Sequence, residues 1–183
     1  MANLLNQNPI IVDTVGLIWD KPVTIYRIDL FPNAAGDGAV FYHYTPSTPL
    51  ASKSQVTTTV SGTNTVTSSG AFVSGTDVSQ YGVIKFSPNC MTSAGVASAN
   101  IGLSRMVLTV SSADAIIVTP STLTNEAAGV YDWDSYAPIP TVKLKSNGSV
   151  VETDHWIAPA GGLHLPNLIL ATLTANAVVH IYI

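Results

Sequence analysis

Residues 22–44 read PVTIYRIDLFPNAAGDGAVFYHY, and this stretch carries the strongest structural signal in the chain. Its first part, 23–31, is dense in β-branched and aromatic residues, which suit the pleated surface of a strand. Residues 32–38 combine Pro, Asn, Asp and Gly, the residue types that tight turns require. Strand character resumes at 39–44. The pattern predicts a hairpin of two β-strands, which identifies a β-protein without identifying a reaction.

The alternation within these strands leaves apolar residues on both faces, which is typical of a strand that is covered on both sides. Arg27 and Asp29 share one face and predict an ion pair. The strongly patterned C-terminal pair of strands, within 162–183, is the expected sandwich partner of this hairpin. Further hairpins are expected within 103–119 and, around an Asn-Gly turn, within 141–153.

The whole chain predicts an all-β fold, because no segment shows a sustained helical period with caps at both ends. We expect an antiparallel β-sandwich or jelly-roll-like barrel with long Ser/Thr-rich loops. Residues 1–8 are expected to form an N-terminal arm and 9–183 a single β-domain. Within that domain, 47–140 is interpreted as an elaboration inserted between core segments 9–46 and 141–183. The sequence leaves open whether the elaboration is a separate domain.

The composition indicates a surface that other subunits cover. Only 10% of residues are charged, Ser and Thr make up about a fifth of the 183 residues, and the net charge is −4. Such a surface has little charge repulsion to keep neighbouring copies apart, so we expect a homo-oligomer. Basic residues form no cluster, which argues against nucleic-acid binding, and no apolar run is long enough for a spanning helix.

The chemistry-bearing residues predict no reaction. The histidines at 43, 155, 164 and 180 show no metal-ligand spacing, and the single Cys90 is interpreted as a small buried or half-buried side chain. Asp132 and Asp134 lack the glycine and distal glutamate of a calcium loop. We therefore expect no enzyme, no cofactor and no catalytic or metal-binding residue.

One aromatic and acidic segment is a candidate contact site. Tyr131, Asp132, Trp133, Asp134 and Tyr136 are expected in a loop, as an interface or glycan contact, because Tyr and Trp are enriched at binding hot spots. The alternative is that these rings pack against a neighbouring strand.

Two stretches resemble a known class of proteins. Residues 33–40, NAAGDGAV, and the C-terminal runs 162–168, GLHLPNL, and 173–182, LTANAVVHIY, resemble the small β-sandwich structural proteins of tailed-bacteriophage virions, such as capsid decoration and accessory proteins. The resemblance covers about a third of the chain, and residues 47–140 depart from it.

The resemblance implies a non-enzymatic virion structural protein. It would act as a capsid decoration or cement protein, binding the capsid lattice through its β-surfaces and its N-terminal arm. Its expected partner is the major capsid protein or another virion protein. Its expected location is the virion, assembled in the host cytoplasm. The alternative is a receptor- or glycan-binding module of a phage fibre or spike.

Overall fold

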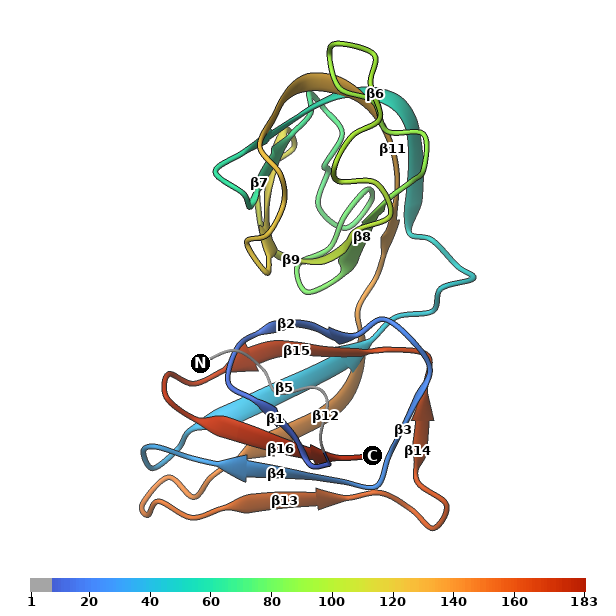
Figure 1. Ribbon diagram of the computed structural model, residues 1–183. Coiled ribbons are helices and arrows are strands. Elements are labelled where there is room, and N and C mark those ends of the chain that lie inside the picture. Colours follow the sequence, from blue (N-terminus) through green and yellow to red (C-terminus); the bar gives the residue numbers. More distant parts are fainter. Residues whose placement is uncertain (1–7) are drawn as a thin grey trace. The chain divides into compact units, whose positions relative to one another are not determined.

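The computed structural model describes residues 8–183, and these form β-strands, turns and bends without any helix (Figure 1). The expected all-β fold is confirmed. The N-terminal arm expected at 1–8 lies outside the described residues, apart from Asn8. The chain divides into two compact units, one built from residues up to 43 together with 139–183, and the other from 44–138. Each unit encloses a hydrophobic core of its own.

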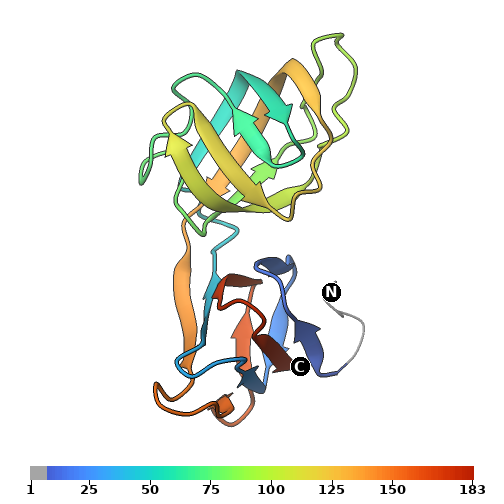
Figure 2. The same ribbon diagram turned by 90° about the vertical axis from the view of Figure 1, so that its left-hand side faces the viewer.

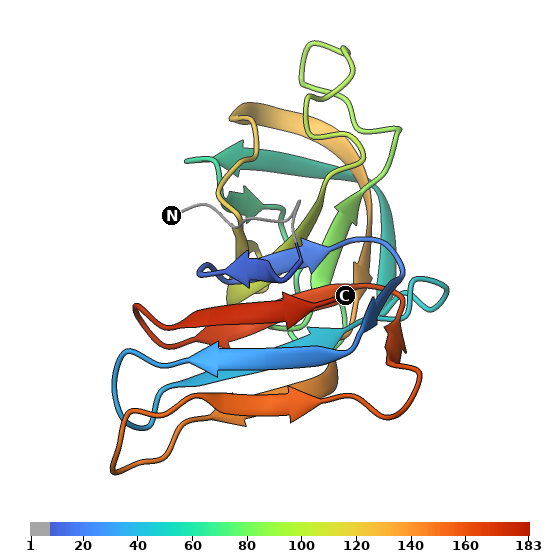
Figure 3. The ribbon, with the colours of Figure 1, turned by 60° about the horizontal axis from the view of Figure 1, so that its bottom comes forward.

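The first unit contains two four-stranded antiparallel sheets. Sheet A has the order β1 (Ile10–Val12), β16 (Val178–Tyr182), β4 (Arg27–Phe31), β13 (Asp154–Ile157). Figure 3 shows these strands in that order, from dark blue through red and blue to orange. Sheet B has the order β2 (Gly16–Trp19), β15 (Leu168–Leu173), β5 (Gly38–His43), β12 (Ile139–Lys145). A short two-stranded ribbon joins β3 (Val23–Ile25) to β14 (Leu163–Leu165).

The two sheets are linked strand by strand, because strands that follow each other in the chain lie in opposite sheets. Four such arches, β1 to β2, β4 to β5, β12 to β13 and β15 to β16, stack side by side. Eight strands in two sheets with this connectivity form a jelly roll. The inserted second unit occupies the connection between β5 and β12.

The hairpin expected within 22–44 is wrong, although both of its strands exist. β4 pairs with β13 and β16, whereas β5 pairs with β12 and β15. Segment 32–37 is therefore an arch between the sheets. The hairpin expected within 141–153 is wrong for the same reason, since β12 and β13 belong to different sheets. An arch and a hairpin both join two strands by a polar turn. The alternation of side chains along a strand does not indicate which neighbouring strand forms the backbone hydrogen bonds.

The arch turns bond to one another at one end of the sandwich. The Asp37 carboxylate accepts hydrogen bonds from the amides of Asn33 and Ala34, which closes the β4–β5 turn. The Gly36 amide donates to the Asn147 carbonyl at 2.9 Å, in the β12–β13 turn. Gly36 has a φ of +83°, a conformation that favours glycine. The Asn-Gly pair thus takes part in a contact between arches.

The jelly-roll core lies between the two sheets. Inward-facing residues of both sheets fill it, including Ile28 and Leu30 of β4, Phe41 of β5, Leu170 of β15 and Ile181 of β16. The expected pairing of the 22–44 segment with the C-terminal strands is confirmed, because β4 pairs with β16 and β5 pairs with β15. Both pairs lie in the middle of their sheets, so these four strands form the centre of the unit.

The second unit is a closed six-stranded antiparallel barrel (Figures 1 and 2). Its strands are β6 (Ala51–Ser61), β7 (Thr65–Thr67), β8 (Val83–Phe86), β9 (Ser104–Ser112), β10 (Ala115–Thr119) and β11 (Glu126–Tyr136). They follow the circular order β10-β7-β6-β11-β8-β9. Closure removes unpaired sheet edges. The hairpin expected within 103–119 is confirmed, since β9 pairs with β10.

Candidate binding surfaces

The segment 131–136 is part of strand β11, so the loop expected there is wrong. Its aromatic residues are buried: Tyr131, Trp133 and Tyr136 are 0%, 1% and 7% exposed. Trp133 stacks on Phe72 with ring centroids 5.4 Å apart. The alternative, packing of the rings among neighbouring strands, describes these three residues correctly. They offer no exposed ring to a glycan or a partner.

The alternation of β11 explains this placement. Tyr131 and Trp133 point into the barrel, whereas Asp132 and Asp134 point outward. The Asp132 carboxylate accepts a hydrogen bond from the Gln55 amide at 2.6 Å, and Asp134 accepts one from the Ser52 hydroxyl at 2.5 Å. Both carboxylates therefore tie β11 to the edge of β6. The segment is a structural part of the barrel.

Tyr131 is the centre of a buried polar network. Its hydroxyl donates to the Glu126 carboxylate and lies 3.0 Å from the Ser98 hydroxyl oxygen. The Asn100 side chain donates to the Thr124 carbonyl at 2.9 Å and accepts from the Thr124 amide at 2.8 Å. Burial raises the pKa of the Tyr131 hydroxyl, and the hydrogen bond with Glu126 raises it further. The network fixes two loops against the barrel.

Cys90 is buried, as the sequence predicts. Its thiol donates to the Asp132 carbonyl, with the two atoms 3.2 Å apart. Burial raises the pKa of this thiol, which disfavours the nucleophilic thiolate.

The outer face of sheet A carries three rows of side chains from strands β13, β4 and β16. The sheet register places Ile157, Arg27 and Tyr182 in one row, and His155, Asp29 and His180 in the next. Phe31 and Val178 form the third row. Ile157, Arg27, His155 and Phe31 are exposed on this face, with 72% exposure for Ile157. We call this set of eight residues the sheet A face.

Asp29 is a buried carboxylate at the centre of the sheet A face. Its side chain is 2% exposed because the flanking side chains cover it. Arg27 Nε donates to Asp29 Oδ1 at 2.6 Å, which confirms the expected ion pair, and the Arg27 guanidinium lies 5.4 Å from the Tyr182 ring centroid. Burial alone would raise the pKa of Asp29, but the hydrogen bonds from Arg27 and His155 outweigh it and lower this pKa. The hydrogen bond to Asp29 raises the pKa of Arg27.

The contact between His155 and Asp29 fixes the histidine tautomer. His155 Nδ1 lies 2.8 Å from Asp29 Oδ1 and therefore carries the proton that bridges them. The 3.2 Å approach of Arg27 Nη2 to the same nitrogen is then a contact between two donors. The other ring nitrogen, Nε2, belongs to a side chain that is 46% exposed. The sheet A face thus exposes the Arg27 cation and the His155 imidazole beside aliphatic and aromatic side chains such as Ile157.

The remaining histidines lie apart from this cluster, except His180. His180 packs on Phe31 with ring centroids 4.4 Å apart, within the sheet A face. His43 bonds to the Thr141 hydroxyl in sheet B, and burial lowers its pKa. His164 bonds to the Thr24 hydroxyl in the short ribbon. Among residues 8–183, no three His, Cys, Asp or Glu side chains gather as a metal site.

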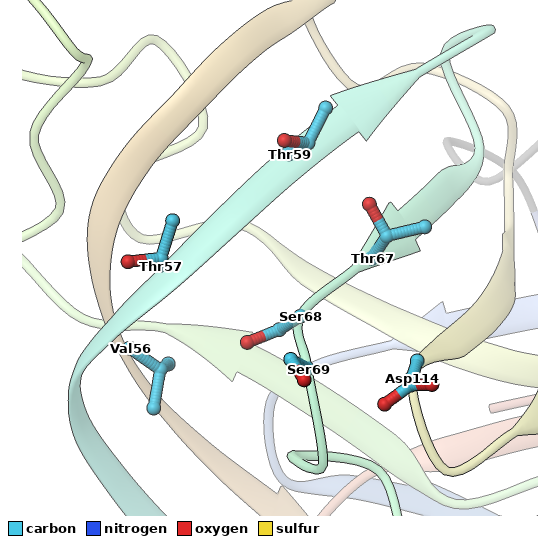
Figure 4. A pocket seen from close by; sticks show the side chains of 7 residues that line it. All are labelled: Val56, Thr57, Thr59, Thr67, Ser68, Ser69 and Asp114. Atoms are coloured by element: carbon cyan, nitrogen blue, oxygen red, sulfur yellow. The ribbon is translucent and has the colours of Figure 1, made fainter.

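A second candidate surface is an open groove on the outside of the barrel (Figure 4). It encloses about 560 Å³, and its lining consists of Val56, Thr57, Thr59, Thr67, Ser68, Ser69 and Asp114. Thr59 of β6 lies directly opposite Thr67 of β7. Both point outward because the next pair along these strands, Val60 and Val66, points into the core. Asp114 Oδ1 accepts a hydrogen bond from the Gly70 amide at 2.6 Å.

Sequence reasoning found one residue pair of these surfaces and missed the rest. Arg27 and Asp29 are two residues apart, so strand alternation is enough to place them together. His155 reaches Asp29 across 126 positions of the chain, and no local pattern records that contact. The groove has a local signal, the alternation of Val and Thr within 55–67, which marks an outward row of hydroxyls.

Comparison of the chain with models of known protein families, with curated proteins and with solved structures found no match. None of the described residues belongs to a helix that is long and apolar enough to cross a membrane.

Proposed function

We propose that this chain is a non-enzymatic structural protein of a tailed-phage virion, a decoration or cement protein that docks on the capsid lattice through the sheet A face. The observation that carries the proposal is the composition of that face. Ile157, Arg27 and Tyr182 form one continuous row, and Tyr and Arg are enriched at protein-binding hot spots.

The face suits a protein partner better than a small substrate. It is the outer surface of a β-sheet, and the groove described on the barrel belongs to the other unit. A partner that covers Ile157 removes a largely exposed aliphatic side chain from water, which favours binding. The Arg27 guanidinium, which Asp29 and Tyr182 hold in place, donates a hydrogen bond to an acceptor on the partner.

The low charge of the chain supports assembly in many copies. With 10% charged residues, neighbouring copies repel each other weakly, so a homo-oligomer on the capsid is favoured. Each contact can be modest, because linked copies gain avidity from multivalent attachment. The partner in this proposal is the major capsid protein or another virion protein, and the location is the virion.

The test has two parts. Quantitative mass spectrometry of purified particles is expected to find the chain in a fixed ratio to the major capsid protein. Purified protein added to particles that lack it is expected to rebind, and Ile157→Asp is expected to weaken rebinding about tenfold or more, because the partner must then bury a charge.

Val151→Asp is the matched control, because Val151 is an exposed aliphatic residue of the same unit outside the sheet A face. It is expected to rebind like the wild type. Absence of the chain from particles, or equal rebinding by both variants, would refute the proposal.

The aromatic segment 131–136 no longer supports the alternative of a receptor- or glycan-binding module. The rings of Tyr131, Trp133 and Tyr136 are buried in the barrel and cannot stack on a sugar.

A further inference from the structure

We propose that the open groove on the barrel binds a short neutral oligosaccharide. This inference is independent of the docking proposed for the sheet A face, because the groove belongs to the inserted unit and shares no residue with that face. It is based on hydroxyl groups that have no hydrogen-bond partner among the described residues and that lie beside methyl groups in the groove.

The hydroxyl groups in the groove lack protein partners. Thr57, Thr59 and Thr67 make no side-chain hydrogen bond to any other residue that the structure describes. Thr58, which lies between two of them and points inward, instead donates to the Val56 carbonyl at 3.2 Å. The outward hydroxyls are thus available to a ligand, and each can both donate and accept.

The spacing of these hydroxyls follows from the sheet. Thr57 and Thr59 lie two residues apart on β6, a separation of about 7 Å, and Thr59 faces Thr67 across the strands at about 5 Å between Cβ atoms. The strands thus hold a two-dimensional array of hydroxyls in fixed positions. Strand residues lose little further freedom when a ligand binds, which favours recognition by an array of weak bonds.

The charge of the groove selects the class of ligand. No Lys or Arg lines it, so it offers no counter-charge to a phosphate or a sulfate. A single carboxylate, Asp114, is too few for a bound metal ion. One oxygen of Asp114 is engaged by the Gly70 amide, which fixes the side chain, and the other is available to accept from a ligand hydroxyl. A neutral ligand rich in hydroxyl groups matches this lining.

The methyl groups complete the match. Each threonine places a methyl beside its hydroxyl, and Val56 adds a further apolar surface at the groove wall. A sugar ring has the same mixed character, with C–H groups on its faces and hydroxyls at its rim. The volume of about 560 Å³ falls within the range of roughly 300–1,000 Å³ that is common for small-ligand sites.

The experiment combines a glycan array with NMR titration of the full chain. The array is expected to show bound neutral glycans, and one positive oligosaccharide is then titrated into ¹⁵N-labelled protein. The amide signals of 56–59, 67–70 and 114 are expected to shift together. The double variant Thr59→Val/Thr67→Val, which removes two hydroxyls and keeps the shape, is expected to weaken binding about five- to tenfold.

Thr109→Val is the matched control, because Thr109 is an exposed threonine of barrel strand β9 outside the groove. It is expected to bind like the wild type. A second variant, Asp114→Asn, tests the carboxylate without changing its size, and circular dichroism checks that each variant is folded.

The proposal is overturned if no neutral glycan binds on the array, if the shifts are confined to residues outside the groove, or if Thr109→Val weakens binding equally. Preferential binding of sulfated or sialylated glycans would also overturn it. Capsid rebinding by the Thr59→Val/Thr67→Val variant is expected to be unchanged, so this inference and the proposed docking fail separately.

Discussion

Replacement of Asp29 by Asn tests the charge cluster at the centre of the sheet A face. Asn keeps the size of the side chain and one acceptor oxygen, but it removes the negative charge that faces Arg27 and His155 at 2.6 and 2.8 Å. The jelly-roll unit is expected to lose stability at neutral pH, because the two donors keep their positions and lose their charged acceptor.

The size of the stability loss follows from the burial of Asp29, Arg27 and His155. Hydrogen bonds to a charged group contribute about 1.5–3 kcal/mol each when they are shielded. Arg27 and His155 are 44% and 46% exposed, so water screens both contacts, and exposed pairs contribute only about 0.2–1 kcal/mol. Since Asp29 itself is 2% exposed, we expect a loss between these limits, about 1–2 kcal/mol in total.

The loss is expected to depend on pH with a definite sign. The pKa of Asp29 is lower in the folded chain than its ordinary value, so the unfolded state takes up a proton first as the pH falls. The stabilisation is fully present above the unfolded pKa of about 3.9 and disappears as the pH falls through the lower folded value. The difference between wild type and Asp29→Asn is therefore largest near neutral pH and shrinks in acid.

The assay is urea unfolding followed by tryptophan fluorescence in a Trp133→Phe background. The two remaining tryptophans, Trp19 and Trp156, both pack against the jelly-roll core and report on that unit. The control Glu152→Gln removes an exposed carboxylate of the same unit and is expected to change stability by less than about 0.5 kcal/mol. An Asp29→Asn loss that is absent at neutral pH, or that is as large in acid as at neutral pH, refutes the assigned role of the charge.

Two further substitutions test the barrel by urea unfolding followed with circular dichroism. Tyr131→Phe leaves the buried polar groups around Glu126 without their central hydroxyl, so a loss of about 1–3 kcal/mol is expected; an unchanged midpoint would mean that the network adds nothing to stability. Gly129→Ala directs a methyl group onto the Met91 carbonyl oxygen and is expected to destabilise the barrel by about 1–3 kcal/mol. Gly148→Ala, which meets no atom within 4 Å, is its control, and equal effects of both alanines would contradict the steric argument.

The candidate surfaces were predictable from the sequence only where their residues are close in the chain. The pair Arg27 and Asp29 follows from alternation on one strand, and the outward threonines follow from the Val-Thr alternation of β6 and β7. Tyr131 and Trp133 were expected in a loop as contact residues, with packing against a neighbouring strand as the alternative, and the structure places them in strand β11. In a barrel strand the same alternation places aromatic rings inward and carboxylates outward.

The sequence was sufficient to predict strands within 23–31 and 39–44 and the polar turn between them, but not the strand at 126–136. The β-branched and aromatic residues of 23–31 and 39–44 favour strands because their side chains suit a pleated, half-buried surface. Tertiary contacts make turn 32–37 an arch between sheets and close 44–138 into a barrel with its own core. The physical reason is that each strand offers backbone hydrogen bonds on both edges, and the choice of partner depends on residues more than a hundred positions away, such as Ile181 beside Ile28.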